Sequence, residues 1–329
     1  MFHIGGEQEL RDKHFFSEVT NSGRSSLRLI IENAGLAEKH ILVPNFLCEV
    51  ILDVLKEYRI TYSFYEVDET LNYQMPANIN EYDAVYFINY FGFKLPSLKR
   101  ALTLCTQPVI VDDVFSPYPS VVSESVNSWY SFNSLRKISP VADFSLVYSS
   151  QPIKKARVRC LDDFAADKYQ AKQLKSRFLQ SGEGDESEYL NLFSSAESLL
   201  DDSVGIFEPS SRSVIEAIEF YAGLETERLA RKANFDLAKS LLPADISLGL
   251  NSDFYSYLPI LIEGRNDVRR QLMDSNVFLA IHWPDIDGVE NVLSGRILSL
   301  PLDSRYSVEE IKQLCIQIKQ VLKQPGIHS

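Results

Sequence analysis

The sequence is poor in the residues that most often bind metals or form disulfides. It contains 5 histidines, spread singly along the chain, and 4 cysteines. No two cysteines form a CxxC pair, and among the histidines only His282, beside Trp283, has a notable neighbour. Zinc sites need clustered ligands, and disulfide frameworks need regularly spaced cysteines. We therefore expect no metal at the functional site, and we interpret the cysteines as reduced thiols.

Positive charge is also scarce. Lys and Arg number 33 against 45 Asp and Glu, which gives a formal net charge of −12. A protein that binds nucleic acid usually concentrates Lys and Arg on one face, because neutralising phosphates releases counterions. We therefore expect no nucleic-acid partner, although a small anion can still bind locally.

Long apolar runs are absent as well. None approaches the roughly 20 residues that a membrane-spanning helix needs. The opening residues, MFHIGGEQELRDKH, lack the basic and then apolar order of a secretion signal. These features favour a cytoplasmic protein that has no membrane partner.

The length and composition favour a globular protein with two domains. The chain has 329 residues, of which 45% are hydrophobic and 24% charged, and domains commonly hold about 100–200 residues. We predict a large domain over 1–242 and a small one over 243–329, because the pattern changes at Pro243. Residues 161–202 are polar, acidic and helical, and we expect them to form a solvated excursion from the large domain.

The first half alternates helical and strand-like patterns. Apolar residues follow helical spacing after the turn at 22–25 and again over 49–58 and 96–105; strand-like runs occupy 40–44, 61–67, 83–91 and 109–111. Such alternation predicts an α/β domain with a mainly parallel sheet flanked by helices. Ligands of these folds bind beyond the carboxyl ends of the strands, so we expect the site close to Asp112.

The second half predicts a smaller α/β unit. A helix over 225–242 leads to strand-like segments at 255–262, 277–281 and 296–300, with a helix at 267–274. The final helix begins with a capping box, Ser307-Val308-Glu309-Glu310, and carries one apolar stripe. We interpret that stripe as part of the core.

Three segments carry residues that suit chemistry. The first is Ser22-Gly23-Arg24-Ser25, at the start of a helix, where free N–H groups and the helix dipole favour a phosphate. An ordinary N-cap and turn would have the same sequence. The pattern alone leaves both interpretations open.

The second segment ends in two carboxylates. Asp112 follows the apolar strand 109–111, where burial penalises its charge unless a partner is present. A protonated heterocyclic nitrogen would be such a partner, as would a structural arginine or the N–H groups of the next turn. Asp113 should point the other way, because side chains alternate along a strand.

The third segment is the hydroxyl-rich stretch 131–140, which contains Ser131, Ser134, Arg136 and Lys137 between two strand-like runs. A lysine that is partly desolvated beside a cation has a lowered pKa, as Schiff-base chemistry requires. Most lysines are simply solvated, so the residue type alone does not show whether Lys137 is a Schiff-base lysine or an ordinary surface lysine.

In this order, the segments resemble the DegT/DnrJ/EryC1/StrS family of sugar aminotransferases, within fold type I of the pyridoxal-phosphate enzymes. The similar pieces span almost the whole chain: SGRSSL, ILVPNFLCEVILDVL, FYEVDETLNY, INYFGF, PVIVDDVFSP, SLRKISPVADFSLVYSS, HWP and RILSLPLDSRYSVEEI. The resemblance implies an α/β, fold type I aminotransferase-like architecture with pyridoxal 5′-phosphate as cofactor.

The resemblance also implies roles for single residues. Lys137 would be the catalytic lysine that forms the internal aldimine, and Asp112 would pair with the pyridine nitrogen of the cofactor. The turn with Gly23, Arg24 and Ser25 would hold the phosphate, and Ser131 or Ser134 would add a contact to it. Lys137 would then act as general base and acid for the proton shift at the substrate carbon.

The sequence departs from the family pattern beside the cofactor. Phe115 stands where many relatives have His or Gln, and Cys48 replaces the aromatic residue that usually stacks on the ring. The glycines common after the lysine are missing from 141–145. Two alternatives therefore accompany the aminotransferase: a non-catalytic cofactor-binding protein, and a lyase or dehydratase of the same fold. Relatives that became dehydratases replace the lysine by histidine, so Lys137 favours transamination.

The resemblance implies substrates and an assembly too. The substrate would be a nucleotide-linked keto-deoxysugar of surface-polysaccharide or antibiotic sugar biosynthesis, and glutamate would be the amino donor. Enzymes of this fold type usually form homodimers whose active sites lie at the subunit interface, so we expect a homodimer with a shared active site.

Overall fold

The computed structural model describes residues 14–123, 126–154 and 159–323. The opening segment, which lacks the pattern of a secretion signal, lies almost entirely outside this range, at residues 1–13. Among the described residues, no helix is both long enough and apolar enough to cross a membrane.

The large domain is built on an eight-stranded sheet of order β1-β8-β7-β6-β5-β2-β3-β4. The central pairs β2–β3, β2–β5, β5–β6 and β6–β7 are parallel, and antiparallel pairs close the two ends. The mainly parallel sheet predicted from the sequence is therefore confirmed. Its strands are β1 (Phe16–Thr20), β2 (His40–Pro44), β3 (Thr61–Val67), β4 (Tyr73–Gln74), β5 (Ala84–Ile88), β6 (Val109–Asp112), β7 (Trp129–Phe132) and β8 (Ser145–Ser149).

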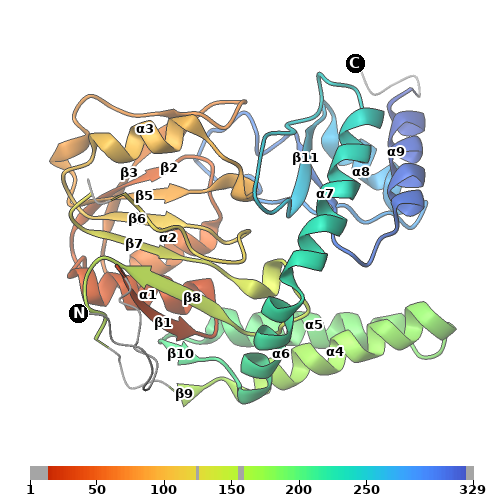
Figure 1. The fold of residues 1–329 in the computed structure, drawn as a ribbon, viewed down its shortest axis with the longest axis horizontal. Coiled ribbons are helices and arrows are strands. Elements are labelled where there is room, and N and C mark those ends of the chain that lie inside the picture. Colours follow the sequence, from red (N-terminus) through yellow and green to blue (C-terminus); the bar gives the residue numbers. More distant parts are fainter. Residues whose placement is uncertain (1–13, 124–125, 155–158, 324–329) are drawn as a thin grey trace, which may run out of the picture.

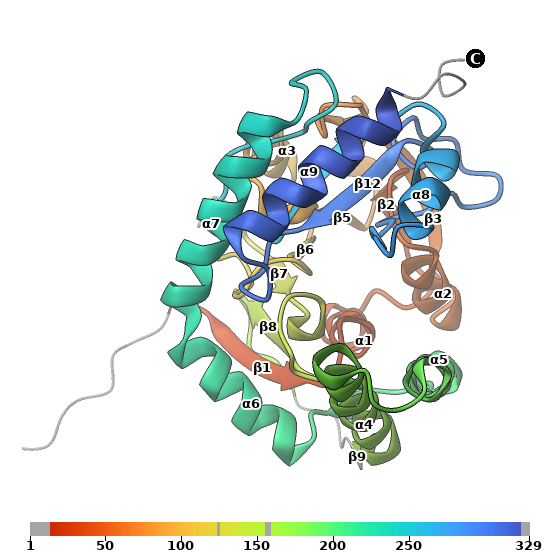
Figure 2. The ribbon, with the colours of Figure 1, turned by 90° about the vertical axis from the view of Figure 1, so that its right-hand side faces the viewer.

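Helices cover both faces of this sheet. Helices α1 (Gly23–Ala34) and α2 (Glu49–Glu57) lie on one face, and α3 (Pro96–Leu104) lies on the other (Figures 1 and 2). All residues of β5 and β6 are buried, as expected for central strands covered on both sides. The carboxyl ends of β6 and β7, at Asp112 and Phe132, therefore lie within a buried core.

The predicted polar excursion is a helical hairpin. Helices α4 (Asp162–Ser181) and α5 (Glu186–Asp202) pack against each other and extend away from the sheet in Figure 1. A small separate cluster, formed by Phe164, Ala196 and Leu200, holds the two helices together. Short strands β9 (Arg159–Cys160) and β10 (Phe207–Glu208) pair at its base.

Helices α6 (Ser211–Ala222) and α7 (Leu224–Leu241) connect the large domain to a second core. That core contains the antiparallel pair β11 (Tyr257–Leu261) and β12 (Ile297–Pro301), with α8 (Arg265–Met273) and α9 (Val308–Leu322). Ser307 and Glu310 form the predicted capping box of α9, and the apolar stripe of that helix is buried in the core. The end of α7 also contributes to this core, so the boundary at 242/243 stays a prediction.

The strand predicted at 277–281 is wrong. Only Ala280 forms an isolated bridge, to Ser299 of β12. Asn276 and Trp283, on either side, have φ of 58° and 52°, in the left-handed region. These residues turn the chain at both ends of the segment, and between the turns it forms this one bridge and no ladder.

Candidate active site

Most of the predicted site residues meet in one cavity of about 240 Å³. It lies where the carboxyl ends of β6 and β7 approach the start of α1, with further walls from α5 and the second core. The lining residues singled out from the sequence are Gly23, Arg24, Cys48, Asp112, Phe115, Ser134 and Lys137. Segments far apart in the chain thus form a single pocket.

Asp112 presents a buried carboxylate to this cavity. It accepts hydrogen bonds from the Tyr86 hydroxyl at 2.8 Å and from the Val114 N–H at 3.0 Å. Burial raises the pKa of Asp112 to about 7, although these two hydrogen bonds and the charge of Lys137 oppose the shift. A cationic partner in the cavity would stabilise the ionised form.

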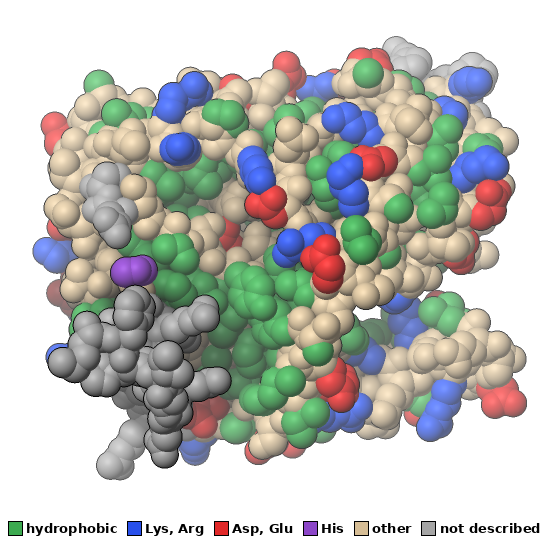
Figure 3. Space-filling model, viewed as in Figure 1, with side chains coloured by type: hydrophobic (Ala, Val, Ile, Leu, Met, Phe, Trp, Pro, Cys, Tyr) green, Lys and Arg blue, Asp and Glu red, His purple; other side chains and the backbone are tan. Residues whose placement is uncertain are grey.

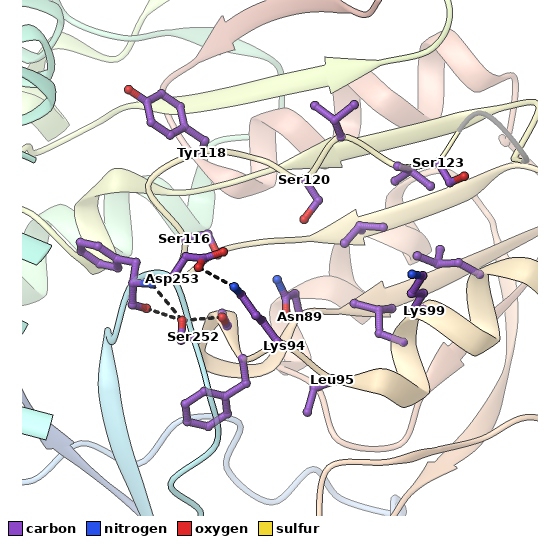
Figure 4. A pocket seen from close by; sticks show the side chains of 18 of the residues that line it. Asn89, Lys94, Leu95, Lys99, Ser116, Tyr118, Ser120, Ser123, Ser252 and Asp253 are labelled. Carbon is purple, nitrogen blue, oxygen red and sulfur yellow. Dashed lines mark hydrogen bonds and ion pairs between the residues drawn. The ribbon is translucent and has the colours of Figure 1, made fainter. Parts of the chain in front are cut away.

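Asp113 turns to the other side, as strand alternation predicts. Its carboxylate accepts hydrogen bonds from the Asn89 side chain at 2.7 Å and from the N–H and hydroxyl of Ser120 at 2.6 Å and 2.9 Å. Asn89 and Ser120 line a different and larger cavity of about 860 Å³ (Figure 4). Asp113 therefore anchors the loop after β6, whereas Asp112 faces the smaller cavity.

Lys137 ends a short 3₁₀ turn (Leu135–Lys137) that follows β7. Solvent reaches its side chain through the cavity, but the surrounding protein desolvates the amine. This desolvation and the charge of Arg136 lower the pKa of Lys137 to about 8. The neutral, nucleophilic fraction of this amine near neutral pH is therefore larger than in an ordinary lysine.

The start of α1 forms another wall. Ser22 caps this helix, and its hydroxyl accepts a hydrogen bond from the Ser25 N–H at 3.3 Å. N–H groups in the first turn of a helix lack partners within the helix and favour an anion. A Cβ on Gly23 would lie 3.2 Å from the Phe132 ring, so glycine allows this helix to approach β7 closely.

Two of the predicted phosphate contacts lie outside the cavity. The Ser25 hydroxyl donates to Asn21 at 2.7 Å and accepts from the Phe207 N–H at 3.2 Å, within the core. Ser131 is buried on β7 and donates to the Ser120 carbonyl at 2.6 Å. Ser134, beyond the end of that strand, does line the cavity.

Aromatic rings form the wall opposite α1. The ring centre of Phe115 lies 4.6 Å from that of His282 and 5.4 Å from that of Trp283. His282 makes a 2.8 Å hydrogen bond with the Ser299 hydroxyl, and burial lowers its pKa to about 3, so its ring is neutral. Cys48, just before α2, contributes its small side chain to the lining.

Several lining residues were not predicted as part of the site. Sequence reasoning noted Arg136 only as a cation beside Lys137, and it noted His282 and Trp283 only as an unusual pair. Glu197 of α5 was not considered, yet it lines the cavity and pairs with Arg136 at 2.7 Å. No local pattern indicates that Glu197 lines the cavity, because the sequence of α5 is that of an ordinary polar helix.

The described part of the chain contains no group of three or more His, Cys, Asp or Glu side chains that could hold a metal ion. The polar groups of the cavity are instead a lysine, two arginines, two carboxylates, hydroxyls and the ring of His282. This set suits an organic ligand that has a carbonyl, a basic nitrogen and an anionic group.

Comparisons of the sequence with known proteins give no match: no protein-family model fits the chain, and no curated protein is similar enough to be recognised. Comparison of the structure does find relatives in shape. A DegT DnrJ EryC1 StrS aminotransferase from Brucella abortus is similar with a TM-score of 0.63 at 16% identity, over 94% of this chain and 86% of that one.

Two further solved structures are similar. NtdA from Bacillus subtilis, crystallised with bound cofactor PMP, has a TM-score of 0.66 at 11% identity, over 94% of this chain and 74% of its own. DesI, crystallised in the presence of its TDP-sugar product, has a TM-score of 0.61 at 14% identity, over 92% and 80% of the two chains. The chain therefore has the fold of the fold type I sugar aminotransferases, which confirms the predicted fold class.

Proposed function

We propose that the protein is a pyridoxal-phosphate-dependent aminotransferase. One observation carries the proposal: a lysine of lowered pKa, a buried carboxylate and the start of a helix line the same small cavity in a fold shared with such enzymes. Each group alone has an ordinary structural explanation. Their meeting at the carboxyl ends of parallel strands is what the ordinary explanations do not account for.

The residues of the cavity fit the cofactor. Asp112 would hold its ring nitrogen, and the first turn of α1 with Ser134 would hold its phosphate. Arg24 has a buried Nη1 atom without a hydrogen-bond partner in the structure, which suits an additional anionic acceptor. Phe115 and Trp283 offer apolar surface to the ring.

When bound, pyridoxal phosphate supplies the electron sink for reactions at an amino-acid α-carbon. Lys137 would attach the cofactor through its amine and would accept and return a proton at the substrate carbon. An amine of pKa about 8 can both accept and return that proton near neutral pH. The buried carboxylate of Asp112, which accepts a hydrogen bond from Tyr86, would stabilise the protonated form of the ring nitrogen of the cofactor.

For the substrates, we infer glutamate as donor and a nucleotide-linked keto-deoxysugar as acceptor, in a cytoplasmic pathway that makes surface-polysaccharide or antibiotic sugars. The sequence resemblance supports this inference, as does the TDP-sugar product with which DesI was crystallised. The experiment is a screen of nucleotide keto-sugars with glutamate. Formation of an amino sugar and 2-oxoglutarate supports transamination, whereas release of ammonia would indicate a lyase or dehydratase.

We also propose a homodimer that shares its active sites. Figure 3 shows hydrophobic side chains gathered in a hollow on the face of the molecule that carries α6. Exposed apolar residues come from α6 and from the loop after β6, and the rings of Tyr118 and Tyr221 stack at 4.7 Å to join the two segments. The exposed members are Tyr118, Val121, Val214, Ile215 and Ile218.

Such a patch is typical of a surface that a partner covers. The 240 Å³ cavity is also below the roughly 300–1,000 Å³ of common ligand sites. A nucleotide sugar would therefore need space outside it. Sedimentation of the protein and of an Ile215→Asp/Ile218→Asp variant tests the dimer: the variant should become monomeric, and a monomeric wild type would contradict the proposal.

A further inference from the structure

The α4–α5 hairpin brings two carboxylates to the arginines of the cavity. Asp201 of α5 forms an ion pair with Arg24, and Glu197, one helical turn earlier, pairs with Arg136 at 2.7 Å. Glu197 also accepts a hydrogen bond from the buried Lys168 of α4 at 2.5 Å. Both arginines line the cavity, and each of them has a carboxylate partner on α5.

The hairpin is fixed well enough to keep these carboxylates in place. Lys172 of α4 donates to the carbonyl of Pro140 at 2.7 Å, and the Tyr169 hydroxyl accepts from the Ala142 N–H at 3.3 Å. These contacts attach α4 to the segment that follows Lys137. The hairpin core is small and separate from the two larger cores, so on the cavity side α5 is joined to the large domain chiefly by its ion pairs.

The carboxylate of Glu197 is ionised over the whole physiological range of pH. Burial would raise the pKa of Glu197, but Arg136 and Lys168 lower it to about 2. Three cations, Arg24, Arg136 and Lys168, thus face two carboxylates, which leaves about one positive charge. A phosphate monoester carries about −1.5 to −2 charges at pH 7. Because the carboxylates offset part of the positive charge, the phosphate would meet a weaker positive potential than the arginines alone would provide.

We propose that Glu197 and Asp201 compete with the phosphate of the cofactor for Arg24 and Arg136 and so set how tightly the cofactor is held. This inference rests on the proposed function, since it concerns the phosphate end of the same cavity. Arg24 keeps one buried donor, Nη1, without a partner in the structure, so a phosphate can still be recognised beside Asp201. The carboxylates weaken that recognition without abolishing it.

The test is the affinity of the cofactor-free, full-length protein for pyridoxamine 5′-phosphate, measured by calorimetry. This probe carries the phosphate but cannot form a bond with Lys137. Glu197→Gln and Asp201→Asn should each bind it about three- to tenfold more tightly, because each removes one negative charge close to the phosphate in a partly solvated site. Asp201 is exposed, so Asp201→Asn keeps the test informative if loss of the Lys168 partner destabilises Glu197→Gln.

Two controls separate this effect from a general change in charge. Asp202→Asn removes the same charge from the next residue of α5, which is exposed, and should leave the affinity unchanged. Pyridoxamine, which lacks the phosphate, should bind the wild type and all variants equally. Equal or weaker binding of pyridoxamine 5′-phosphate by both Glu197→Gln and Asp201→Asn would overturn the proposal, as would an equal gain for pyridoxamine.

Inorganic phosphate distinguishes failure of this inference from failure of the proposed function. Suppose that the wild type binds neither pyridoxamine 5′-phosphate nor pyridoxamine, but that the variants bind inorganic phosphate more tightly than the wild type does. The cofactor assignment then fails, whereas the competition between the carboxylates and a phosphate stands. If pyridoxamine 5′-phosphate binds but the variants show no gain, the competition fails and the cofactor assignment stands. Absence of binding for all three probes rejects both.

Discussion

Asp112 and Asp113 are consecutive residues, yet their carboxylates serve different sides of the sheet: Asp112 accepts from Tyr86 beside the smaller cavity, and Asp113 accepts from Asn89 and Ser120. Replacement of Asp112 by asparagine should therefore affect the reaction differently from replacement of Asp113. Asp112→Asn should slow the half-reaction with glutamate by about 100-fold or more, because the ring nitrogen of the cofactor loses its counter-charge. Asp113→Asn should slow it less than tenfold.

Rapid mixing of each cofactor-loaded variant with glutamate measures this difference. Asp113→Asn is the matched control, since it makes the same chemical change one residue away. Equal losses in the two variants would contradict the role given to Asp112, and a larger loss for Asp113→Asn would transfer that role to Asp113.

The raised pKa of Asp112 predicts a dependence of stability on pH in the cofactor-free protein. Its pKa is about 7 when folded and 3.8 ordinarily, so the folded state binds more protons between these values. Stability from this group is thus present at low pH and is lost as pH rises towards 7. The Asp112→Asn variant does not undergo this loss. Its free energy of unfolding, relative to that of the wild type, should therefore rise between pH 4 and 7 by on the order of 1–3 kcal/mol.

Urea unfolding of both proteins at several pH values measures this gain. The difference should level off above pH 7. A difference that stays constant from pH 4 to 7 would show that Asp112 is not forced towards neutrality by its surroundings.

Arg24 should matter more for retaining the cofactor than for the reaction. Its guanidinium lines the cavity and has a free buried donor, so Arg24→Ala should weaken cofactor binding by about tenfold. The half-reaction rate at saturating cofactor should change by less than about threefold, since Arg24 is not assigned to any proton transfer. Equilibrium dialysis gives the affinity, and an unchanged dissociation constant would restrict Arg24 to its ion pair with Asp201.

Phe115 should contribute to stability as well as to the cavity. Its ring stacks on Phe91 at 5.7 Å and meets the His282 ring edge-on at 4.6 Å. Phe115→Leu should lower the free energy of unfolding by about 1–2 kcal/mol, through lost ring contacts and imperfect packing. The exposed Phe64 is the control: Phe64→Leu should change stability by less than about 0.5 kcal/mol. Equal effects in urea unfolding would contradict the buried role of Phe115.

Local sequence patterns predicted much of the fold, whereas the roles at the centre of the candidate site, Lys137 and Asp112, were implied by the family resemblance. The apolar run 109–111 predicted a buried central strand, and alternation along that strand correctly sent Asp112 and Asp113 in opposite directions. The capping box at Ser307 located the start of the last helix. These features depend on neighbours in sequence, so the sequence alone suffices for them.

Other features depend on which segments meet in space. Ser131 and Ser25 have hydroxyls suited to a phosphate, but β7 and α1 direct them to Ser120 and Asn21 inside the core. Glu197 reaches Arg136 only because the α4–α5 hairpin folds back towards the cavity. The segment 277–281 has a strand-like composition, but it lies between two turns and forms a single bridge to β12. Periodicity contains no information on such long-range contacts.

The identity of the lysine that carries the cofactor is the most direct test of the account. The purified protein, supplied with pyridoxal phosphate, is reduced with borohydride, and peptide mapping locates the labelled residue. We predict that Lys137 carries the label, that glutamate added before reduction prevents labelling by converting the cofactor to its pyridoxamine form, and that Lys137→Ala folds but lacks the visible absorbance. Labelling of another lysine, or absorbance retained in Lys137→Ala, would contradict the account.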